Sequence, residues 1–309
     1  MDVSIITINY NSSKHTLACI QSILEQTSTT ISYEIIIIDN ASENADYEQL
    51  LTGLKTIVTS VPIQAYRSVI NTGFGGGNML GVQHATGSYY AFLNNDILLR
   101  NDCISCCIDF IKAQAAAVVA PMQLDEHGNY ISSFDYFLTI KTALLGRRLL
   151  HTINPTTYPD RTTPPKKPQR VDCVAGSFMF IDGNAFDNIG GFDTNIFLYY
   201  EETDLCYRIL KQSSNGTCYL LPHASYTHFS GTSTKKSVLI KGELKRSMLY
   251  VLKKHSSIIG FNIFQCLFIL KWLFKTAVKP SYLPILKHII AGDSPAFSLK
   301  NTQQIKRIK

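Results

Sequence analysis

The sequence predicts an α/β fold with a mostly parallel central sheet, and three observations lead to that prediction. Residues 1–100 alternate short apolar runs with segments that have helical spacing. The apolar runs are almost continuous in isoleucine, as in strands buried on both faces of a sheet. The composition, with 45% hydrophobic and 17% charged residues, is that of a globular chain. Its 309 residues suit one large domain, or one domain with an extension.

The expected elements follow in order from the N-terminus. Val3–Ile8 is apolar and β-branched, and it is expected to form the first strand. Ser12–Gln26 places apolar residues at helical spacing, so a helix is expected there. Tyr33–Ile38 and Tyr89–Leu93 repeat the strand pattern. Because strands that alternate with helices usually pair in parallel, these segments predict a sheet covered on both faces.

Polar residues stand where these strands end. They are Asn9, Tyr10, Asp39 and Asp96. In sheets of this kind, ligands bind outside the carboxyl ends of the strands. We therefore expect these four side chains to lie along one edge of the sheet and to belong to a functional site.

Residues 141–170 interrupt the alternating pattern. This stretch holds five of the eleven prolines and seven basic residues, which predicts a long surface loop between regular elements. Regular structure is expected to resume at Val171, with a strand through Phe178–Ile181 and then a polar, aromatic segment that ends at Arg208.

Charge divides unevenly along the chain. Residues 1–234 carry 14 basic and 21 acidic side chains, whereas residues 235–309 carry 15 basic and 2 acidic ones. We therefore expect one domain over 1–234 and a basic, apolar helical tail over 235–309. Such a tail is expected to meet a polyanion, either nucleic acid or an anionic membrane surface. Its lysines are interleaved with contiguous aliphatic residues, which favours the membrane and argues against nucleic acid.

Ile258–Val278 is the most apolar part of this tail. Asn262, Gln265, Lys271 and Lys275 interrupt it, so its longest uncharged stretch is short for a bilayer crossing, which needs about 20 predominantly apolar residues. An amphipathic helix lying in the membrane plane fits the pattern better. The alternative is a core helix that packs on the body.

The eight cysteines lie in apolar runs, and their spacing does not match a zinc site. They predict reduced, buried thiols in a cytosolic protein. The chain also opens directly on a strand, so we expect no secretory signal peptide.

Four motifs carry the candidate chemistry, and the first is the glycine-rich segment Asn71–Gly81. Its missing Cβ atoms and free backbone N–H groups allow close approach to a phosphate. The segment departs from the dinucleotide-binding fingerprint at Asn78, where that fingerprint has glycine.

The second and third motifs are Asn94-Asn95-Asp96 and Thr227–Ser233. In Asn94-Asn95-Asp96, a carboxylate at a strand end can coordinate a hard divalent ion, while water and phosphate oxygens complete the coordination. A turn explains the same residues without any chemistry. The third motif, Thr227–Ser233, contains His228, which gains significance only if it converges with Asp96 in space.

The fourth motif, Tyr199–Arg208, crowds Glu201, Glu202 and Asp204 together. Like charges at this spacing raise one another's pKa, and a carboxylate with a raised pKa suits a general base near neutral pH. The alternative is an acidic first turn that complements a helix N-terminus. Asp204 stands four residues before Arg208, the spacing of a helical ion pair, so Asp204 is expected to be structural.

Taken in order, these segments resemble the family 2 glycosyltransferases of the rhamnosyltransferase-like, lipopolysaccharide type. The resemblance covers residues 3–235, and it rests on the order and spacing of short motifs. The motifs are Val3–Tyr10, Ile38–Ser42, Asn71-x-Gly73-Phe74, Phe92–Asp96, Gly176–Phe178, Ile189–Asp193, Tyr200–Arg208 and His228-x-x-Gly231-x-Ser233.

The resemblance implies a GT-A fold, here with a C-terminal amphipathic helical extension, and inverting transfer of a sugar from a nucleotide-diphosphate donor. It assigns residues 1–100 to the half that binds the nucleotide sugar and residues 171–234 to the acceptor and catalytic half. The acceptor that it implies is a saccharide or a lipid-linked saccharide in cell-surface polysaccharide synthesis. Acceptor choice would depend on the 141–170 loop and the region near Gly176.

The resemblance also implies roles for the site residues. Glu202 would be the general base and Glu201 its partner in the acidic pair, although the family usually has aspartate at the position of Glu202. Asp96 would bind a divalent metal, Mn²⁺ or Mg²⁺, with His228 as a further ligand. The donor would be held by Thr7, Asn9, Tyr10, Asp39, Asn71, Gly73, Phe74, Asn94 and Asn95.

Two other interpretations remain open. A nucleotidyltransferase would share the nucleotide-binding half, but it needs a basic residue aimed at the attacked phosphate, and Asn9–Ser13 contains none. A catalytically inactive GT-A-like module for membrane attachment or assembly would have no use for the acidic pair, Asp96 and His228. The leading hypothesis is a cytoplasmic sugar transferase that is peripheral on the inner face of the cell membrane.

Overall fold

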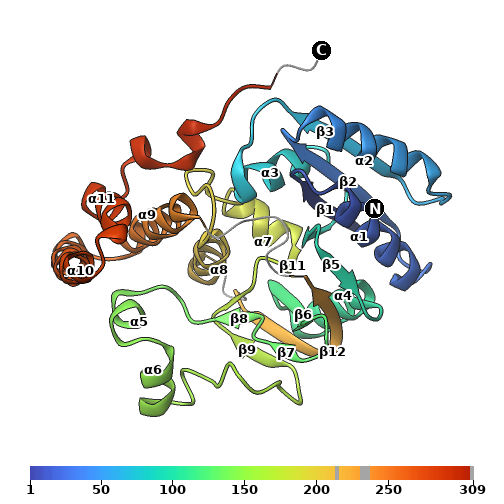
Figure 1. Cartoon of the computed structure of the whole chain (residues 1–309). Coiled ribbons are helices and arrows are strands. Elements are labelled where there is room, and N and C mark those ends of the chain that lie inside the picture. The colour runs from blue at the N-terminus through green and yellow to red at the C-terminus, as the bar shows by residue number, and fades with distance from the viewer. Residues whose placement is uncertain (213–215, 230–236, 307–309) are drawn as a thin grey trace.

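A computed structural model describes residues 1–212, 216–229 and 237–306 (Figure 1). A central twisted sheet has helices on both faces, and a group of helices from the C-terminal part lies at one side of it (Figure 1). The strands of the described chain are β1 (Val3–Asn9), β2 (Tyr33–Asn40), β3 (Ile63–Ser68), β4 (Tyr89–Asn94), β5 (Ile97–Leu99), β6 (Val118–Leu124), β7 (Tyr130–Ile131), β8 (Phe134–Asp135), β9 (Gln169–Val171), β10 (Cys173–Val174), β11 (Phe178–Asp182) and β12 (Cys218–His228).

Helices separate most of these strands. They are α1 (Ser13–Gln26), α2 (Asn44–Thr56), α3 (Gly73–Val82), α4 (Cys103–Gln114), α5 (Ile140–Leu145), α6 (Arg147–Ile153), α7 (Gly183–Asn188), α8 (Glu201–Gln212), α9 (Val238–His255), α10 (Ile258–Val278) and α11 (Leu283–Ala291). Short 3₁₀ helices are η1 (Pro280–Tyr282), η2 (Pro295–Phe297) and η3 (Leu299–Thr302). The four elements predicted before residue 100 are present, each within two residues of its expected ends.

The main sheet has the strand order β3-β2-β1-β4-β11-β6-β12-β5. Strands β3, β2, β1 and β4 are mutually parallel, as the isoleucine-rich runs predicted. Strand β11 runs antiparallel to both β4 and β6, whereas β12 runs parallel to β6. Because β11 is reversed, its first residues lie at the same edge as the carboxyl ends of β1, β2 and β4.

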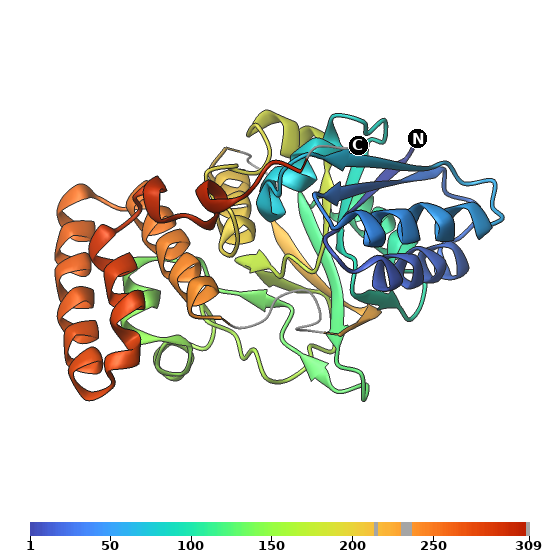
Figure 2. The same ribbon diagram turned by 45° about the horizontal axis from the view of Figure 1, so that its top comes forward.

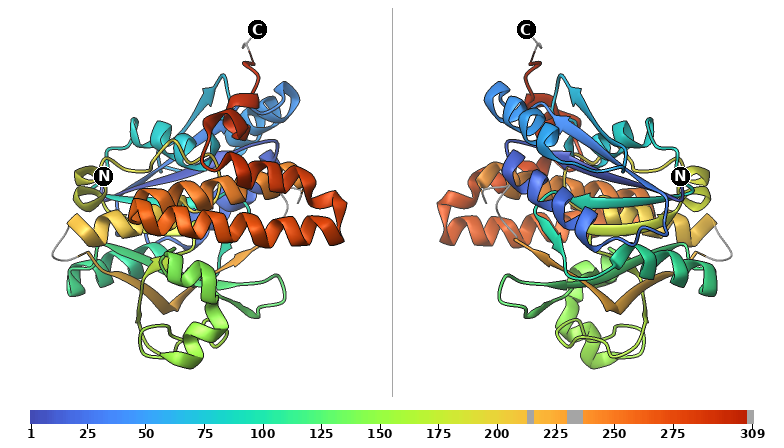
Figure 3. Two further views of the ribbon diagram at one scale, coloured as in Figure 1. Left: turned by 90° about the vertical axis from the view of Figure 1, so that its left-hand side faces the viewer. Right: turned by 90° about the vertical axis from the view of Figure 1, so that its right-hand side faces the viewer.

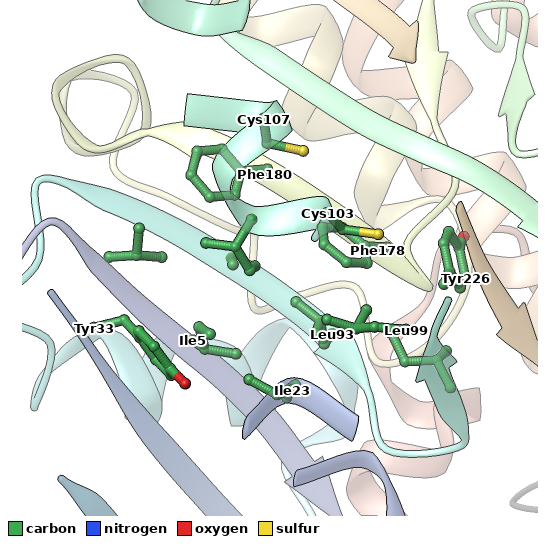
Figure 4. Packing of buried hydrophobic residues seen from close by; sticks show 14 of the residues in the cluster. Ile5, Ile23, Tyr33, Leu93, Leu99, Cys103, Cys107, Phe178, Phe180 and Tyr226 are labelled. Atoms are coloured by element: carbon green, nitrogen blue, oxygen red, sulfur yellow. The ribbon is translucent and has the colours of Figure 1, made fainter. Parts of the chain in front are cut away.

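The core forms two apolar layers, one on each face of the sheet. On the face covered by α1 and α4, Ile5, Ile23, Leu93 and Phe178 pack with Tyr226 (Figure 4). On the other face, β1 contributes Ile6, which belongs to the layer under α7 and α8. Successive residues of a strand point to opposite faces, so a strand that is apolar at every position supplies both layers.

The prediction of an unbroken surface loop over 141–170 was wrong. Helices α5 and α6 occupy its first part, where Thr139 caps α5 in a box with Thr142, and Leu150 of α6 is fully buried. The prolines of this stretch begin only at Pro155, so helix-forming residues before it are free to make two short helices.

The chain beyond residue 237 packs closely on the body. Glu243 and Arg246 of α9 are buried, and Arg246 donates to the carbonyl oxygens of Asn195 at 3.3 Å and Ser294 at 3.2 Å. The boundary predicted between residues 234 and 235 lies outside the described residues. The last described segment then crosses to the N-terminal half, where the N–H of Lys306 donates to the Val69 carbonyl (Figure 2).

Helix α10 lies at the outer side of the helical group, next to α11 and near α5 and α6 (Figure 3). Within the described residues, it is the one helix whose length and hydropathy would allow it to cross a bilayer, and only 22% of its most apolar window is buried. Cys266 is exposed on this helix and Cys106 is half-buried, so the prediction that all the cysteines are buried was wrong for these two.

Candidate active site

The predicted site residues gather at the edge where β1, β2 and β4 end. The backbone N–H of Asn94, the last residue of β4, donates to the carbonyl oxygen of Ser177 at 2.9 Å. Ser177 immediately precedes the antiparallel strand β11. This contact joins the N-terminal half of the sheet to the segment that leads toward the acidic pair.

Asp96 and His228 lie side by side although 132 residues separate them in the chain. The antiparallel pairing of β5 with β12 places Ile97 opposite His228, and Asp96 directly precedes Ile97. The imidazole Nε2 lies 3.1 Å from Asp96 Oδ1, and the two side chains are 14% and 6% exposed. Gly231 and Ser233, from the same motif as His228, lie outside the described residues.

The two asparagines before Asp96 point in different directions. The Asn94 side-chain nitrogen lies 3.4 Å from His228 Nε2, beside the carboxylate–imidazole pair. The Asn95 amide instead donates to the hydroxyls of Ser12 at 2.6 Å and Thr16 at 2.8 Å. We therefore correct the role of Asn95. Its side-chain amide attaches the turn to α1 and is not available to bind the nucleotide-sugar donor.

Thr7 and Asn9 are also placed differently from their predicted roles as donor contacts. Both are fully buried. The Asn9 amide donates to the carboxylates of Asp39 and Asp46, each at 2.9 Å, and its oxygen accepts from Thr16 at 2.8 Å. Asn9 therefore orients Asp39. Because Asp39 is fully buried as well, none of these three side chains presents a face to a ligand.

Asp39 is held by a residue that the sequence analysis missed. Arg67 Nε lies 3.2 Å from the Asp39 carboxylate, and Arg67 Nη2 donates to the Ser42 carbonyl at 2.7 Å. The pairing of β2 with β3 sets Arg67 opposite Asp39. Tyr10, the residue after β1, is 37% exposed, so it is the predicted nucleoside contact with the most accessible surface.

Asn40 is a second residue that the sequence analysis missed. Its oxygen accepts from the Thr72 N–H at 2.9 Å, and its nitrogen donates to the Asn71 side chain at 3.0 Å and the Gly73 carbonyl at 3.1 Å. One buried amide thus fixes the glycine-rich segment to the end of β2. The available signal was its position directly after Asp39, at a strand end.

Gly73 begins α3 in a conformation that other residues rarely adopt. Its φ is +78°, and a Cβ at this position would lie 2.1 Å from the carbonyl oxygen of Phe197. The next N–H, that of Phe74, donates to this same carbonyl at 3.0 Å. Glycine is therefore required here both for the turn and for the close approach of the two backbones.

Replacing Gly73 with alanine is expected to destabilise the protein by more than about 2 kcal/mol. A positive φ costs an alanine about 1 kcal/mol, and the clash with a backbone oxygen adds to it. Gly128→Ala is the matched control, because Gly128 has a φ of +84° and no atom lies within 4 Å of its Cβ position. Urea unfolding measures both; equal losses would show that the contact with Phe197 is not a constraint.

The acidic pair begins α8 after a strained turn. Tyr199 and Tyr200 have φ values of +69° and +70°, in the region that bulky residues avoid. Glu201, which follows them, is 5% exposed, and its Oε2 has no hydrogen-bond partner among the described residues. Glu202 instead lines a cavity of about 460 Å³. The cavity makes Glu202 the member of the pair that a substrate can reach.

Both carboxyl groups of the pair are held toward their neutral forms. Burial and the neighbouring Glu202 raise the pKa of Glu201 well above its ordinary value. Burial, with a smaller contribution from the charge of Asp135, raises the pKa of Glu202 to about 7. A base of this pKa is partly ionised at neutral pH and can still accept a proton, which is what general-base catalysis requires.

Asp204 has a different environment, and its expected structural role is confirmed. Its carboxylate accepts hydrogen bonds from Arg208 Nε at 2.8 Å and His255 at 2.7 Å, and Lys254 Nζ lies 2.8 Å away. Burial alone would raise the pKa of Asp204, but these partners together lower it to about 2. Asp204 therefore joins α8 to α9 as a permanent anion and is not a candidate base.

Gly176 connects the acidic pair to the nucleotide side of the site. A Cβ at Gly176 would lie 4.0 Å from the Glu202 Cβ and 3.6 Å from the Phe74 ring. Ser177, the next residue, pairs with Asn94, whose amide adjoins His228. The cavity at Glu202 is not lined by Asp96 or His228, so it is this continuous set of contacts that brings the three motifs to one region.

The arrangement matches a known family. A family model described as glycosyl transferase family 2 matches residues 4–188, which is more than half of the chain. The chain belongs to glycosyl transferase family 2. The matched region contains Asp39, the glycine-rich segment and Asp96, whereas Glu202 and His228 lie beyond it.

Curated relatives of this family 2 chain share low sequence identity with it. The low-salt glycan biosynthesis hexosyltransferase Agl10 of Haloferax volcanii is 24% identical over 229 residues, covering 70% of this chain and 64% of Agl10. The rhamnosyltransferase WbbL of Escherichia coli is 27% identical over 186 residues, covering 57% of this chain and 66% of WbbL. The matches thus span just under two thirds of the length of either relative.

Solved structures show the same fold. GalNAc-T7, crystallised with UDP, GalNAc and Mn²⁺, superposes with a TM-score of 0.57 at 16% identity, over 80% of this chain and 47% of GalNAc-T7. TarS of S. aureus (residues 1–349), in complex with UDP-GlcNAc, superposes with a TM-score of 0.52 at 15% identity, over 85% of this chain and 70% of TarS. The GT-A fold predicted from the motifs is therefore confirmed.

Proposed function

We propose that the protein is an inverting glycosyltransferase, which moves a sugar from a nucleotide-diphosphate donor to a hydroxyl of a saccharide or lipid-linked saccharide in cell-surface polysaccharide synthesis. The observation that carries the proposal is Glu202, which lines a cavity and adjoins Gly176 in a family 2 chain. The names of Agl10 and WbbL support a hexose or a rhamnose as the transferred sugar. Family membership favours this activity over a nucleotidyltransferase.

Glu202 acts as the general base in this proposal. Its carboxylate takes the proton of the acceptor hydroxyl as that oxygen attacks the anomeric carbon of the donor sugar. Attack from the side opposite the leaving diphosphate inverts the anomeric configuration. Glu201 is the buried neighbour in the acidic pair, and the charge of Glu202 helps to raise the pKa of Glu201. Tyr199 and Tyr200, whose backbone forms the turn before α8, line the cavity beside Glu202.

The donor nucleotide is proposed to lie along the strand-end edge. Tyr10 offers an exposed side chain for the nucleoside. Asp39, at the end of β2, is fully buried and bound by Asn9 and Arg67, so it supports this edge from inside the fold. The loop that Asn40 holds presents Asn71, Gly73 and Phe74 to the rest of the nucleotide. Asn94 borders the same edge through its contact with His228.

A divalent metal fits the Asp96–His228 pair. One carboxylate and one imidazole, 3.1 Å apart and little exposed, offer two ligands to one ion. No group of three or more His, Cys, Asp or Glu side chains suited to a metal occurs in the described part of the chain, so the donor diphosphate and water would complete the coordination. An imidazole ligand suits Mn²⁺ better than Mg²⁺. When bound, the ion would neutralise charge on the departing diphosphate.

A ligand screen followed by a transfer assay tests the proposal. UDP and thymidine diphosphate, each with Mn²⁺, are expected to raise the melting temperature of the protein, because ligand binding to the native state stabilises it. The nucleotide that binds shows which nucleotide sugars to use in the transfer assay, where the sugar carries the label. Label appearing in a saccharide or lipid fraction would support the proposal, and no stabilisation by either nucleotide would contradict it.

We also propose that the protein works at the cytoplasmic face of the cell membrane, held there by α10. Ile259, Ile263, Leu270, Phe274 and Val278 recur at helical spacing and are 74%, 58%, 52%, 75% and 88% exposed. An apolar helix face of this length with no protein cover among the described residues suits the boundary between headgroups and acyl chains. Lysines of the same helix lie beside this face and suit an anionic lipid surface.

Replacing Phe274 with aspartate is expected to weaken vesicle binding about tenfold or more, because a charge replaces a large side chain in the proposed acyl region. Flotation with vesicles that contain phosphatidylglycerol measures the effect. Val58→Asp is the matched control, because Val58 is fully exposed on the body, away from α10. Equal binding by the two variants would contradict the proposed role of α10.

A further inference from the structure

The cavity at Glu202 also contains a cluster of cations. Glu202 and Tyr199 reach it from α8 and the turn before α8, whereas Asp135, Arg147 and Arg161 reach it from β8, α6 and the segment after α6. The cavity therefore joins a proton-accepting carboxyl group to guanidinium groups carried by separate elements. Neither arginine has a role in the chemistry described above.

Two guanidinium groups share one carboxylate in this cluster. Arg147 Nε donates to Asp135 at 2.8 Å, and Arg147 Nη2 makes a second contact with the same carboxylate. Arg161 Nε lies 3.5 Å from it and donates to the Phe134 carbonyl at 2.8 Å. Asp135 thus offsets only one of the two positive charges.

The arginines retain the means to bind a ligand. The Arg147 side chain is 60% exposed and that of Arg161 is 21% exposed. A guanidinium group carries further N–H groups in a planar fork that matches the oxygens of a phosphate. The cluster therefore offers an anion hydrogen-bond donors and, while Glu202 in the same cavity is protonated, an excess positive charge.

The element that carries Arg147 also presents apolar side chains to solvent. Leu144, Leu145, Leu149 and Ile153 of α5 and α6 are 52%, 41%, 47% and 62% exposed. Helix α5 contacts α10, since Ile140 lies 3.2 Å from the Cβ position of Gly260. Helices α5 and α6, which carry these exposed apolar side chains and Arg147, therefore lie near α10 (Figure 3).

We propose that Arg147 and Arg161 form a subsite for a phosphate ester carried by the acceptor, so that the acceptor hydroxyl reaches Glu202 while its phosphate is held by the two arginines. This inference rests on the proposed function, because it assigns the ligand of the cavity that contains the base. If the phosphate is linked to an isoprenoid, the isoprenoid hydrocarbon would lie along α5 and α10. A soluble sugar phosphate would bind to the two arginines alone.

Binding to vesicles tests the subsite without any turnover. The probe is geranylgeranyl diphosphate in phosphatidylcholine vesicles, and the reference is phosphatidylglycerol vesicles of equal charge. Arg147→Gln is expected to weaken binding to the diphosphate vesicles about tenfold, the loss that removal of a charged hydrogen bond produces, and to leave the reference unchanged. Arg148→Gln is the matched control, because Arg148 is the adjacent exposed arginine and does not line the cavity. Equal losses for the two variants, or equal losses on both vesicles, would overturn the proposal.

Chemical modification separates the two possible sources of the phosphate. Phenylglyoxal labels exposed arginines, and mass spectrometry of the peptides reports labelling of Arg147 against Arg148. With EDTA present, protection of Arg147 by inorganic pyrophosphate would support a soluble phosphate, and protection by the diphosphate vesicles alone would support a lipid-linked one. Protection by neither would overturn the subsite. The nucleotide screen is independent of these results, so a failed subsite and a failed transferase assignment are distinguishable.

Discussion

Replacing Glu202 with glutamine is expected to lower the turnover number about 10²- to 10⁴-fold, the usual contribution of a general base. Glutamine keeps the size of the side chain and its place at the start of α8, but it cannot take the proton of the acceptor hydroxyl. Donor affinity is expected to change little, because the interaction that is lost is made in the transition state. Transfer of label from the nucleotide sugar measures turnover, and calorimetry measures nucleotide binding.

The dependence on pH gives this prediction a second readout. Because the pKa of Glu202 is raised to about 7, the fraction of ionised base rises with pH, so turnover is expected to increase up to about pH 7 and then level off. The folded-state pKa lies above the usual 4.5, so the folded protein holds the proton more tightly than the unfolded chain does. Stability is therefore expected to fall as pH rises from about 4.5 through 7, and Glu202→Gln should remove that contribution.

Glu126→Gln is the matched control, because Glu126 is an exposed glutamate on the turn after β6. It should change neither turnover nor the pH profile. If Glu202→Gln kept most of its activity, the base would be another group, and Glu201 would be the next candidate. Glu201→Gln would then have to abolish turnover although Glu201 does not line the cavity.

Local sequence predicted the elements whose pattern is local. Val3–Asn9 and Tyr33–Asn40 are apolar at nearly every position, which identifies buried parallel strands without knowledge of their neighbours. The reversal of β11 and the pairing of β5 with β12 were not predicted, because they depend on contacts between segments more than 80 residues apart. The helices at Ile140–Leu145 and Arg147–Ile153 were missed because the prolines that follow them dominated the interpretation.

The site residues also fall into those that the sequence predicted and those that only the structure revealed. Strand ends indicated Asp39 and Asp96, and crowded acids indicated the group Glu201, Glu202 and Asp204. The family resemblance, and not the crowding, singled out Glu202. Asn9 and Asn95 were predicted to bind the nucleotide-sugar donor, but their amides form hydrogen bonds with protein side chains instead. The sequence does not show in which direction an amide at the end of a strand points. Asn40 and Arg67 act through other residues, so only the structure revealed them.

Replacing Asp96 with asparagine is expected to lower turnover about 10³-fold or more and to abolish the Mn²⁺-dependent part of nucleotide binding. The neutral amide is a weaker ligand for a hard cation, and metal stabilisation of a leaving diphosphate is worth several kcal/mol. Thermal shift with UDP or thymidine diphosphate, with and without Mn²⁺, measures the binding. The stabilisation seen without metal should remain, because Tyr10 and the loop that Asn40 holds are untouched.

Asp109→Asn, on the exposed face of α4, is the matched control and should keep the full Mn²⁺ effect. The decisive comparison is with His228→Ala, because Asp96, directly before β5, and His228, at the end of β12, meet only in the folded protein. If both side chains hold one ion, each single change removes most of its effect, so the double variant should lose little more than either one. Losses that simply add would mean that the two side chains act separately, and the proposed shared ion would then be wrong even if both residues were essential.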